Sequence, residues 1–270
     1  MARVDLSIII VNYKTPELVA DCVTSIKKYT TGIDYEVIVM DNSIKNIGFT
    51  KANNQGLKKA KGKYVLFLNS DTYIDSNVMG EMVTWMDANP KIGISTCKLK
   101  NKDGTSQVTG GYFPTLFRVF MWMTIQDLPL MDKLFKQFHP HKNINKPYEL
   151  DWVTGAFLLV RKEILDETHG FSEDYFMYGE DVDLCFMAKN PPTGGGCEVW
   201  FNPKWSITHL GGASSKKEFP LISEYKGIKI FYKKHYPKWQ YPIMRILLKM
   251  GAVWRIPIFG KTYVKAFTEA

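Results

Sequence analysis

The fold of this chain is decided by one stretch, Tyr64-Val65-Leu66-Phe67-Leu68-Asn69-Ser70-Asp71-Thr72. Its apolar first half is typical of a strand that is buried on both faces of a parallel sheet. Its polar second half begins at the carboxyl end of that strand, which is where ligands bind in open α/β sheets. Asp71 is therefore expected to hold a divalent cation and, through the cation, a diphosphate. Taken alone, the pattern fits ordinary turn or helix-cap chemistry better.

Two earlier apolar runs have the same polar ending. They are residues 6–13 and 35–43, and they end in Asn12, Tyr13, Asp41, Asn42 and Ser43. Between them, the apolar residues of 16–29 recur at helical spacing, with Thr15 as a predicted N-cap and Pro16 at the first helical position. This alternation predicts an α/β fold with a mainly parallel sheet and right-handed crossovers. Because polar residues recur at one edge of the sheet, a binding site is favoured over a chance turn.

Composition agrees with one catalytic domain and an appendage. The chain has 270 residues, of which 45% are hydrophobic and 23% charged, so a disordered protein is excluded. Its four cysteines lack C-x-x-C spacing and are expected to be reduced core thiols, not a zinc or disulfide framework. Met1 leads directly into the first strand, and no apolar run reaches the length of a membrane span. We therefore expect a cytoplasmic protein.

The end of the chain suggests a partner. The formal net charge is +8, and basic residues interleave with aromatic ones from Lys216 onward. This mixture suits an anionic membrane surface, where each Lys or Arg contributes about 1 kcal/mol near the lipid heads. A nucleic acid is the rival partner, but no recognisable binding motif supports it and we expect none. Alternatively, the helices of 216–270 simply pack on the catalytic domain. We favour peripheral attachment to the inner face of the cell membrane.

A second apolar segment, residues 112–138, carries few charges. One interpretation is a buried helix. The other is a mobile flap over an acceptor that carries a lipid, which its methionine and aromatic content also suits. The two interpretations differ in the exposure of the segment.

The motifs, taken in order, resemble those of a known family. The motifs at residues 7–13, 37–43, 46–56 and 68–72 are similar to family 2 glycosyltransferases with the GT-A fold. Those at 154–161, 170–183 and 209–212 resemble the rhamnosyltransferase-like branch that builds bacterial surface polysaccharides such as O-antigen. One departure is that the usual Asp-x-Asp is Asn69-Ser70-Asp71 here, so only Asp71 is a charged metal ligand.

The resemblance covers about residues 5–215 and implies a domain organisation. A Rossmann-like GT-A catalytic domain is expected at 1–215, with a nucleotide-binding half at about 1–100 and an acceptor-binding half at about 101–215. A helical, membrane-associating segment is expected at 216–270. The implied metal is Mg²⁺ or Mn²⁺, held by Asp71 and by His209, which alone would more often be structural.

The predicted sheet edge and the resemblance together assign the remaining site residues. The nucleotide of a UDP- or dTDP-sugar donor is expected to contact Val11, Asn12, Tyr13, Asp41, Asn42, Gly48, Phe49, Asn53, Asn69 and Ser70. The sugar and acceptor are expected to contact Trp152, Thr154, Gly155 and Asp183. In a second interpretation, Asp183 orients a neighbour or the acceptor.

The family pattern assigns the general base to Asp181, with Glu180 as second choice. Helix capping is the structural alternative for this acid pair. A carboxylate at a helix N-terminus is expected to have a lowered pKa, which weakens it as a base unless the site is desolvated. With one base and no evident nucleophile, transfer is expected to invert the sugar, which the resemblance suggests is L-rhamnose from dTDP-rhamnose. The expected acceptor is a polyprenyl-linked saccharide.

Two other function classes fit less well. A metal-dependent nucleotidyltransferase usually shows a Gly-rich, basic loop after its first strand, whereas this chain has Asn12-Tyr13-Lys14-Thr15-Pro16 there. A non-catalytic carbohydrate-binding protein would leave Asp71, Asp181 and His209 without a role.

Overall fold

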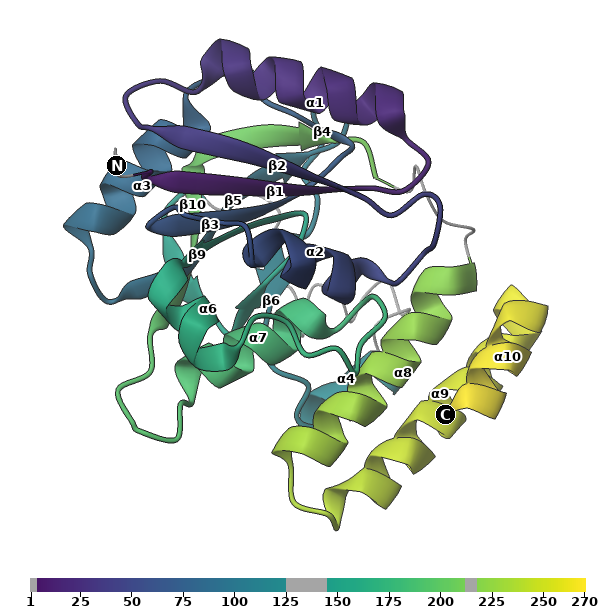
Figure 1. The fold of residues 1–270 in the computed structure, drawn as a ribbon. Helices are drawn as coiled ribbons and strands as arrows, with labels where there is room; N and C mark the ends of the chain where they lie inside the picture. The colour runs from purple at the N-terminus through teal and green to yellow at the C-terminus, as the bar shows by residue number, and fades with distance from the viewer. Residues whose placement is uncertain (1–3, 125–144, 212–217) are drawn as a thin grey trace.

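The computed structural model describes residues 4–124, 145–211 and 218–270, and a mixed sheet forms its centre (Figure 1). Within the described residues, eight strands pair in the order β2-β1-β3-β9-β5-β10-β4, with β7 beside β10. These strands are β1 (Leu6–Asn12), β2 (Tyr35–Asp41), β3 (Tyr64–Asn69), β4 (Thr72–Tyr73), β5 (Ile92–Lys100), β7 (Tyr148–Leu150), β9 (Phe157–Arg161) and β10 (Glu198–His209). A separate pair joins β6 (Gly110–Gly111) to β8 (Trp152–Val153).

The three predicted strands are confirmed, and they are parallel neighbours. In the register of β1 with β2, Asn12 lies opposite Asp41, and in that of β1 with β3, Val11 lies opposite Asn69. The polar ends of all three strands therefore meet at one edge of the sheet, as the sequence predicted.

The sheet is nevertheless not all parallel, because β9 runs antiparallel to both of its neighbours, β3 and β5. Its direction brings the start of β9, instead of its end, to the carboxyl edge of β3. There the backbone N–H of Asn69 donates to the carbonyl of Ala156 at 3.1 Å. Thr154 and Gly155 consequently reach the same edge as Asp71, although they precede their strand.

Helices cover both faces of the sheet. They are α1 (Pro16–Tyr29), α2 (Phe49–Leu57), α3 (Val78–Ala88), α4 (Leu116–Thr124), α6 (Lys162–Thr168), α7 (Glu180–Lys189), α8 (Glu218–His235), α9 (Gln240–Phe259) and α10 (Lys261–Glu269). Successive side chains of a strand point to opposite faces. Accordingly, Ile8 and Ile10 join one buried cluster with α1 and α3, whereas Ile9 joins another with α6 and α7. One apolar core thus lies on each face of the sheet.

The C-terminal helices form a layer beside α4 and α7 (Figure 1). Phe231 of α8 contacts Phe113 and Phe186, with ring centroids 6.1 and 5.2 Å apart. Arg255 of α9 is buried and donates to the carbonyls of Trp122 and Met123 at the end of α4. These helices therefore share an apolar cluster with the rest of the chain. The predicted boundary at residue 215 stays a prediction.

The described part of the second apolar segment is a helix with one buried face. Val119, Met121 and Met123 of α4 are at most 4% exposed, whereas Phe117 and Phe120 are accessible to solvent. Residues 125–138 of the predicted segment lie outside the described residues. Cys22, Cys97 and Cys185 are buried and all four cysteines are free thiols, as expected. Among the helices described, none is both long and apolar enough to span a membrane.

Candidate active site

A cavity of about 560 Å³ opens at the carboxyl edge of β1 and β3. Twelve of the predicted site residues line it, namely Val11, Tyr13, Asn42, Phe49, Asn69, Ser70, Asp71, Thr154, Gly155, Glu180, Asp181 and His209. A wider hollow of about 850 Å³ lies between α3 and β10, beside Trp85 and Trp205. None of the predicted site residues is among the described residues that line this hollow. The chemistry is therefore sought in the first cavity.

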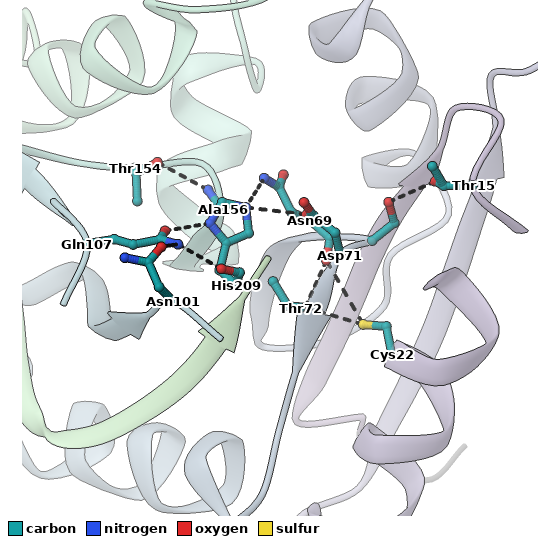
Figure 2. Close-up of polar contacts among 11 residues, drawn as sticks. Thr15, Cys22, Asn69, Asp71, Thr72, Asn101, Gln107, Thr154, Ala156 and His209 are labelled. Atoms are coloured by element: carbon teal, nitrogen blue, oxygen red, sulfur yellow. Dashed lines mark hydrogen bonds and ion pairs between the residues drawn. The ribbon is translucent and has the colours of Figure 1, made fainter. Parts of the chain in front are cut away.

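Asp71 and His209 face each other on the sheet side of this cavity (Figure 2). Strand β10 pairs with β4 so that His209 lies opposite Thr72, which brings its Nε2 to 3.3 Å from Asp71 Oδ1. Burial acts to raise the pKa of Asp71, but the neighbouring His209 and two backbone N–H groups together outweigh it, and the pKa is lowered. The two side chains are close enough to ligate one cation together.

The ligand set fits a divalent cation such as Mn²⁺, which accepts both carboxylate and imidazole ligands. Mg²⁺ prefers oxygen ligands, so it would be coordinated by Asp71 and by oxygen ligands that the protein does not supply. Asn69 supplies an amide in place of a second carboxylate, and its Nδ2 lies 3.2 Å from His209 Nε2. Among the described residues no group of three or more His, Cys, Asp or Glu side chains gathers as a metal site. Asp71 and His209 are therefore the two candidate protein ligands here.

The loop after β2 makes one wall of the cavity. Asn42 is buried, accepts the backbone N–H of Ile47 at 2.9 Å and donates to Asn46 at 3.1 Å. Gly48 then has a φ of +92°, and a Cβ there would lie 2.8 Å from the carbonyl oxygen of Phe176. Only glycine fits this close approach, which starts α2 at Phe49 and turns its N-terminus to the site.

Six predicted residues are not among those that line the cavity, and the side chains that they have make hydrogen bonds within the protein instead. Asn12 and Asp41 contact each other at 3.2 Å, and Asp41 also accepts the N–H of Ser43, which lowers its pKa. Gly48 and Asn53 act within the start of α2, where Asn53 donates to the carbonyl of Phe49 at 3.0 Å. The indole of Trp152 donates to the carbonyl of Tyr112 at 3.2 Å.

Asp183 is the sixth residue outside the cavity. Its side chain is fully buried, and its oxygens accept from Tyr175 at 3.1 Å, from Lys234 at 2.9 Å and from His235 at 2.6 Å. Burial acts to raise the pKa of Asp183, but these hydrogen bonds outweigh it and lower the pKa. Asp183 therefore orients its neighbours, the second of the two interpretations made from the sequence.

Two acids at the start of α7 face the cavity opposite Asp71. Glu180 is 5% exposed, and its Oε2 has no hydrogen-bond partner among the described residues. Burial, and then the charge of Asp181, raise the pKa of Glu180 to about 8. Asp181 accepts the backbone N–H groups of Gly155 at 3.0 Å and Val182 at 2.9 Å.

The pKa of Asp181 is raised, because desolvation outweighs those backbone hydrogen bonds. This reverses the expectation that the helix N-terminus lowers it. The physical reason is that protein surrounds the Asp181 carboxyl group closely enough for desolvation to be the largest effect on its pKa. The condition under which Asp181 was expected to work as a base, desolvation, is met before any acceptor binds.

Several cavity residues were missed by the sequence interpretation. They are Thr15, Asn46, Leu68, Ala156, Phe176, Met177, Tyr178 and Phe219. The side chain of Thr15 makes no helix-capping hydrogen bond, although it precedes α1 as predicted, and its hydroxyl instead lies 3.3 Å from Ser70 Oγ (Figure 2). Phe176 to Tyr178 lie inside a motif that was used for the resemblance, but no residue type in them signals chemistry.

Glu224 of α8 is not among the residues that line the cavity, but the charge of Asp181 acts on its carboxyl group. Its side chain keeps contact with solvent, yet protein surrounds it closely enough that burial, and then the charge of Asp181, raise its pKa to about 7. Glu224 stands out in the sequence because it is one of only three acidic residues in the basic segment after Lys216.

Comparison with known proteins shows what this chain is similar to. A model of the family described as Glycosyl transferase family 2 matches residues 42–168. The rhamnosyltransferase WbbL of Escherichia coli is 28% identical over 149 residues, which cover 51% of this chain and 53% of that protein. The low-salt glycan biosynthesis hexosyltransferase Agl10 of Haloferax volcanii is 27% identical over 222 residues, covering 72% of this chain and 65% of that protein.

A third relative is the N-acetylglucosaminyl-diphospho-decaprenol L-rhamnosyltransferase of Mycobacterium tuberculosis. It is 27% identical over 95 residues, which cover 35% of this chain and 31% of that protein. The chain thus matches from about a third to just under two thirds of the length of these curated relatives.

The fold is shared with solved structures. A mannosyltransferase from Pyrobaculum calidifontis, in complex with GDP-Man and Mn²⁺, aligns with a TM-score of 0.57 at 15% identity. The alignment covers 98% of this chain and 74% of that one. The expected GT-A architecture, with C-terminal helices added, is therefore confirmed.

Proposed function

Because this chain carries a family 2 glycosyltransferase domain, we propose that it moves L-rhamnose from dTDP-rhamnose, with inversion, to a hydroxyl of a lipid-linked saccharide. One observation carries the proposal: a single cavity is lined both by a candidate cation site, Asp71 and His209, and by two acids, the buried Glu180 and the neighbouring Asp181. Glycosyl transfer needs this pairing, since a diphosphate must depart while a hydroxyl loses its proton.

The donor end of the cavity is assigned to the edge of β1 and β3. Asp71 and His209 would hold Mn²⁺ or Mg²⁺, which when bound offsets the charge of the departing diphosphate. The N-terminus of α2 adds backbone N–H groups and the positive end of a helix dipole, which suit phosphate or ribose oxygens. A neighbour of the same fold contains Mn²⁺ and a sugar nucleotide, which supports this division of the cavity.

The acceptor end is assigned to Asp181 and Glu180. At neutral pH Glu180, with a pKa of about 8, keeps its proton, so the negative charge of the pair resides on Asp181, where two backbone N–H groups stabilise it. Asp181 then takes the proton of the acceptor hydroxyl while the oxygen of that hydroxyl bonds to the anomeric carbon of the sugar. The bond from that carbon to the diphosphate breaks, and its electron pair leaves with the diphosphate. One such displacement inverts the sugar.

The identity of donor and acceptor rests on relatives. Two of them are named rhamnosyltransferases, and the acceptor in one of those names is a diphospho-decaprenol carrying N-acetylglucosamine. We infer a polyprenyl-linked saccharide as acceptor and, with it, work at the cytoplasmic face of the membrane. Exposed apolar side chains on α9 and α10, flanked by lysines, support a peripheral position on anionic lipid.

Donor choice and enzymatic activity are tested in one series. Thermal shifts with dTDP, UDP and GDP, each with Mn²⁺, should show the largest rise in melting temperature for dTDP, since a ligand that binds only the folded state stabilises it. Release of dTDP from dTDP-rhamnose should then require a lipid-linked acceptor and stop with EDTA or in Asp71→Asn. Nucleotide binding without release would indicate a carbohydrate-binding protein. Release of diphosphate from a nucleoside triphosphate would indicate a nucleotidyltransferase.

A further inference from the structure

A chain of polar side chains lies behind His209, on the side away from Asp71 (Figure 2). It begins in the turn that follows β5, where Asp103, Thr105 and Asn101 contact one another, and it continues through Gln107. Gln107 Oε1 lies 2.7 Å from His209 Nδ1, and Gln107 Nε2 lies 2.7 Å from the backbone carbonyl of His209. This chain is not part of the cavity lining.

The direction of every hydrogen bond in this chain follows from its two ends. The ionised carboxylate of Asp103 only accepts, so the Thr105 hydroxyl donates to it at 2.6 Å, and the Thr105 oxygen accepts from Asn101 Nδ2 at 2.8 Å. Asn101 therefore turns its oxygen toward Gln107 Nε2, 2.6 Å away. The carbonyl of His209 also only accepts. Both ends thus require the amide nitrogen of Gln107 where it lies.

The tautomer of His209 is then determined. With its nitrogen committed to Asn101 and to the His209 carbonyl, Gln107 presents only its oxygen to Nδ1, so Nδ1 carries the proton. Neutral imidazole has one N–H, so Nε2 keeps its lone pair. In this form Nε2 accepts from Asn69 Nδ2 at 3.2 Å, and it lies 3.3 Å from Asp71 Oδ1.

We propose that Gln107 is a positioning residue, which holds His209 in the Nδ1–H tautomer so that Nε2 is preset as a cation ligand beside Asp71. The proposal rests on the cation site of the proposed function. It explains how a chain with a single carboxylate at this position binds a metal: the neutral ligand needs neither a tautomer change nor a reorientation before it binds. Partners of a ligating histidine contribute about tenfold or more to metal affinity.

The first experiment reads the tautomer directly. Long-range ¹H–¹⁵N NMR of protein labelled in histidine, with the His209 signals assigned through His209→Ala, should show Nδ1 protonated in the metal-free wild type at pH 8. Gln107→Leu, which has a similar size but no polar atoms, should shift His209 toward the Nε2–H form. A wild-type protein with Nε2 protonated would overturn the proposal, and this measurement needs no variant of Gln107 to fold.

The second experiment reads the metal. Free Mn²⁺ is titrated by EPR in the presence of UDP or dTDP. Gln107→Leu should weaken Mn²⁺ binding about tenfold, while Ser106→Ala in the same turn leaves it unchanged. Gln107→Glu keeps an acceptor for Nδ1–H but loses the donor to Asn101 and to the His209 carbonyl, so it should bind Mn²⁺ more tightly than Gln107→Leu. If Gln107→Glu keeps the Nδ1–H tautomer but binds Mn²⁺ as weakly as Gln107→Leu, the link between the His209 tautomer and the metal affinity is refuted. Unchanged affinity in His209→Ala would instead refute the cation site and leave the tautomer result standing.

Discussion

At the scale of single residues, two adjacent acids behave differently because their surroundings differ. Asp181 has two backbone N–H groups on its carboxylate, whereas Glu180 has one oxygen that meets no partner among the described residues. One negative charge is therefore easier to hold on Asp181. A carboxyl group that stays protonated near neutral pH can donate a hydrogen bond, so Glu180 is suited to orient a sugar or acceptor oxygen.

Glu180 should make stability depend on pH in a specific direction. Its pKa is about 8 in the folded protein, above the ordinary value of 4.5. The contribution of protonated Glu180 to the free energy of unfolding is fully present below about pH 4.5. It is lost as pH rises through 8, because the unfolded chain releases the proton at lower pH than the folded protein does. The Glu180→Gln variant does not show this loss. The melting temperature of the variant minus that of wild type should therefore be about 5 °C larger at pH 8.5 than at pH 5. A constant difference across that range would contradict a buried, protonated Glu180.

The kinetic roles of the two acids should also separate. Asp181→Asn is expected to lower turnover by about two to four orders of magnitude while the affinity for donor nucleotide stays within about twofold, as for loss of a general base. Glu180→Gln should lose less, because an amide still donates a hydrogen bond. Single-turnover kinetics with nucleotide affinities measured in parallel check both variants. If Glu180→Gln is the inactive one, the base lies one residue earlier.

At the scale of elements, α7 joins the active site to the C-terminal helices. The start of α7 carries the two acids, and one turn later Asp183 binds Lys234 and His235 of α8 together with Tyr175. The backbone of Phe176, the residue after Tyr175, accepts the N–H of Phe49 at the start of α2 at 2.8 Å. One buried carboxylate thus links the acceptor end, the donor end and the C-terminal layer.

Asp183→Asn should therefore destabilise the whole protein. Removing one partner of a buried charge pair costs about 3 kcal/mol of unfolding free energy. Because the folded pKa of Asp183 is lowered, this contribution is present above about pH 4 and is lost as pH falls through the folded value. Urea unfolding should show the deficit at pH 7 and a smaller one at pH 3.5. Asp166→Asn, at a 62% exposed side chain in a surface pair with Lys162, is the control, with a loss of about 0.5 kcal/mol or less.

Elements with strong local patterns could be predicted from the sequence, and those set by tertiary contacts could not. Helix α1 begins and ends at the predicted residues, Pro16 and Tyr29, and the strands that end in Asn12, Asp41 and Asn69 were found from their apolar runs. The antiparallel direction of β9 was not found, because an apolar run carries no information on its pairing partner. Gln107 was missed for the same reason, since its role depends on a contact with His209, 102 positions away.

At the scale of the whole molecule, the C-terminal layer has two apolar sides. Its inner side packs on α4 and α7 through buried residues such as Phe231 and Met244. Its outer side keeps large apolar side chains in contact with solvent, and on α9 these recur at helical spacing: Ile243, Ile246, Met250, Trp254 and Ile258. Lys238 precedes this row, and Lys261 and Lys265 follow it, all three exposed. An apolar row between basic residues matches the boundary between lipid heads and tails.

This outer face should bind anionic membranes through its side chains. Trp254 and Ile258 are 65% and 62% exposed, so replacing both by serine should leave the fold intact. Losing two such side chains from a lipid contact costs about 2 to 4 kcal/mol, enough to weaken binding at least tenfold. In liposome flotation, wild type should bind vesicles with anionic lipid and not neutral ones, and Trp254→Ser/Ile258→Ser should remain unbound. Ile44→Ser removes an equally apolar side chain, 97% exposed and distant in sequence from α9, and should float like wild type.

Point variants are the right test because deleting 216–270 would strip Tyr225, Phe231 and Tyr232 from the main buried cluster and confound binding with unfolding. Equal binding to neutral and anionic vesicles would remove the role of the lysines, since their attraction depends on lipid charge and weakens with salt. Absence of binding to either, together with a wild-type dimer that the double variant converts to a monomer in light scattering, would assign the face to a second copy of the chain. Binding to anionic vesicles alone, abolished by the double variant and by about 0.5 M salt, would place the active site next to the membrane that carries a lipid-linked acceptor.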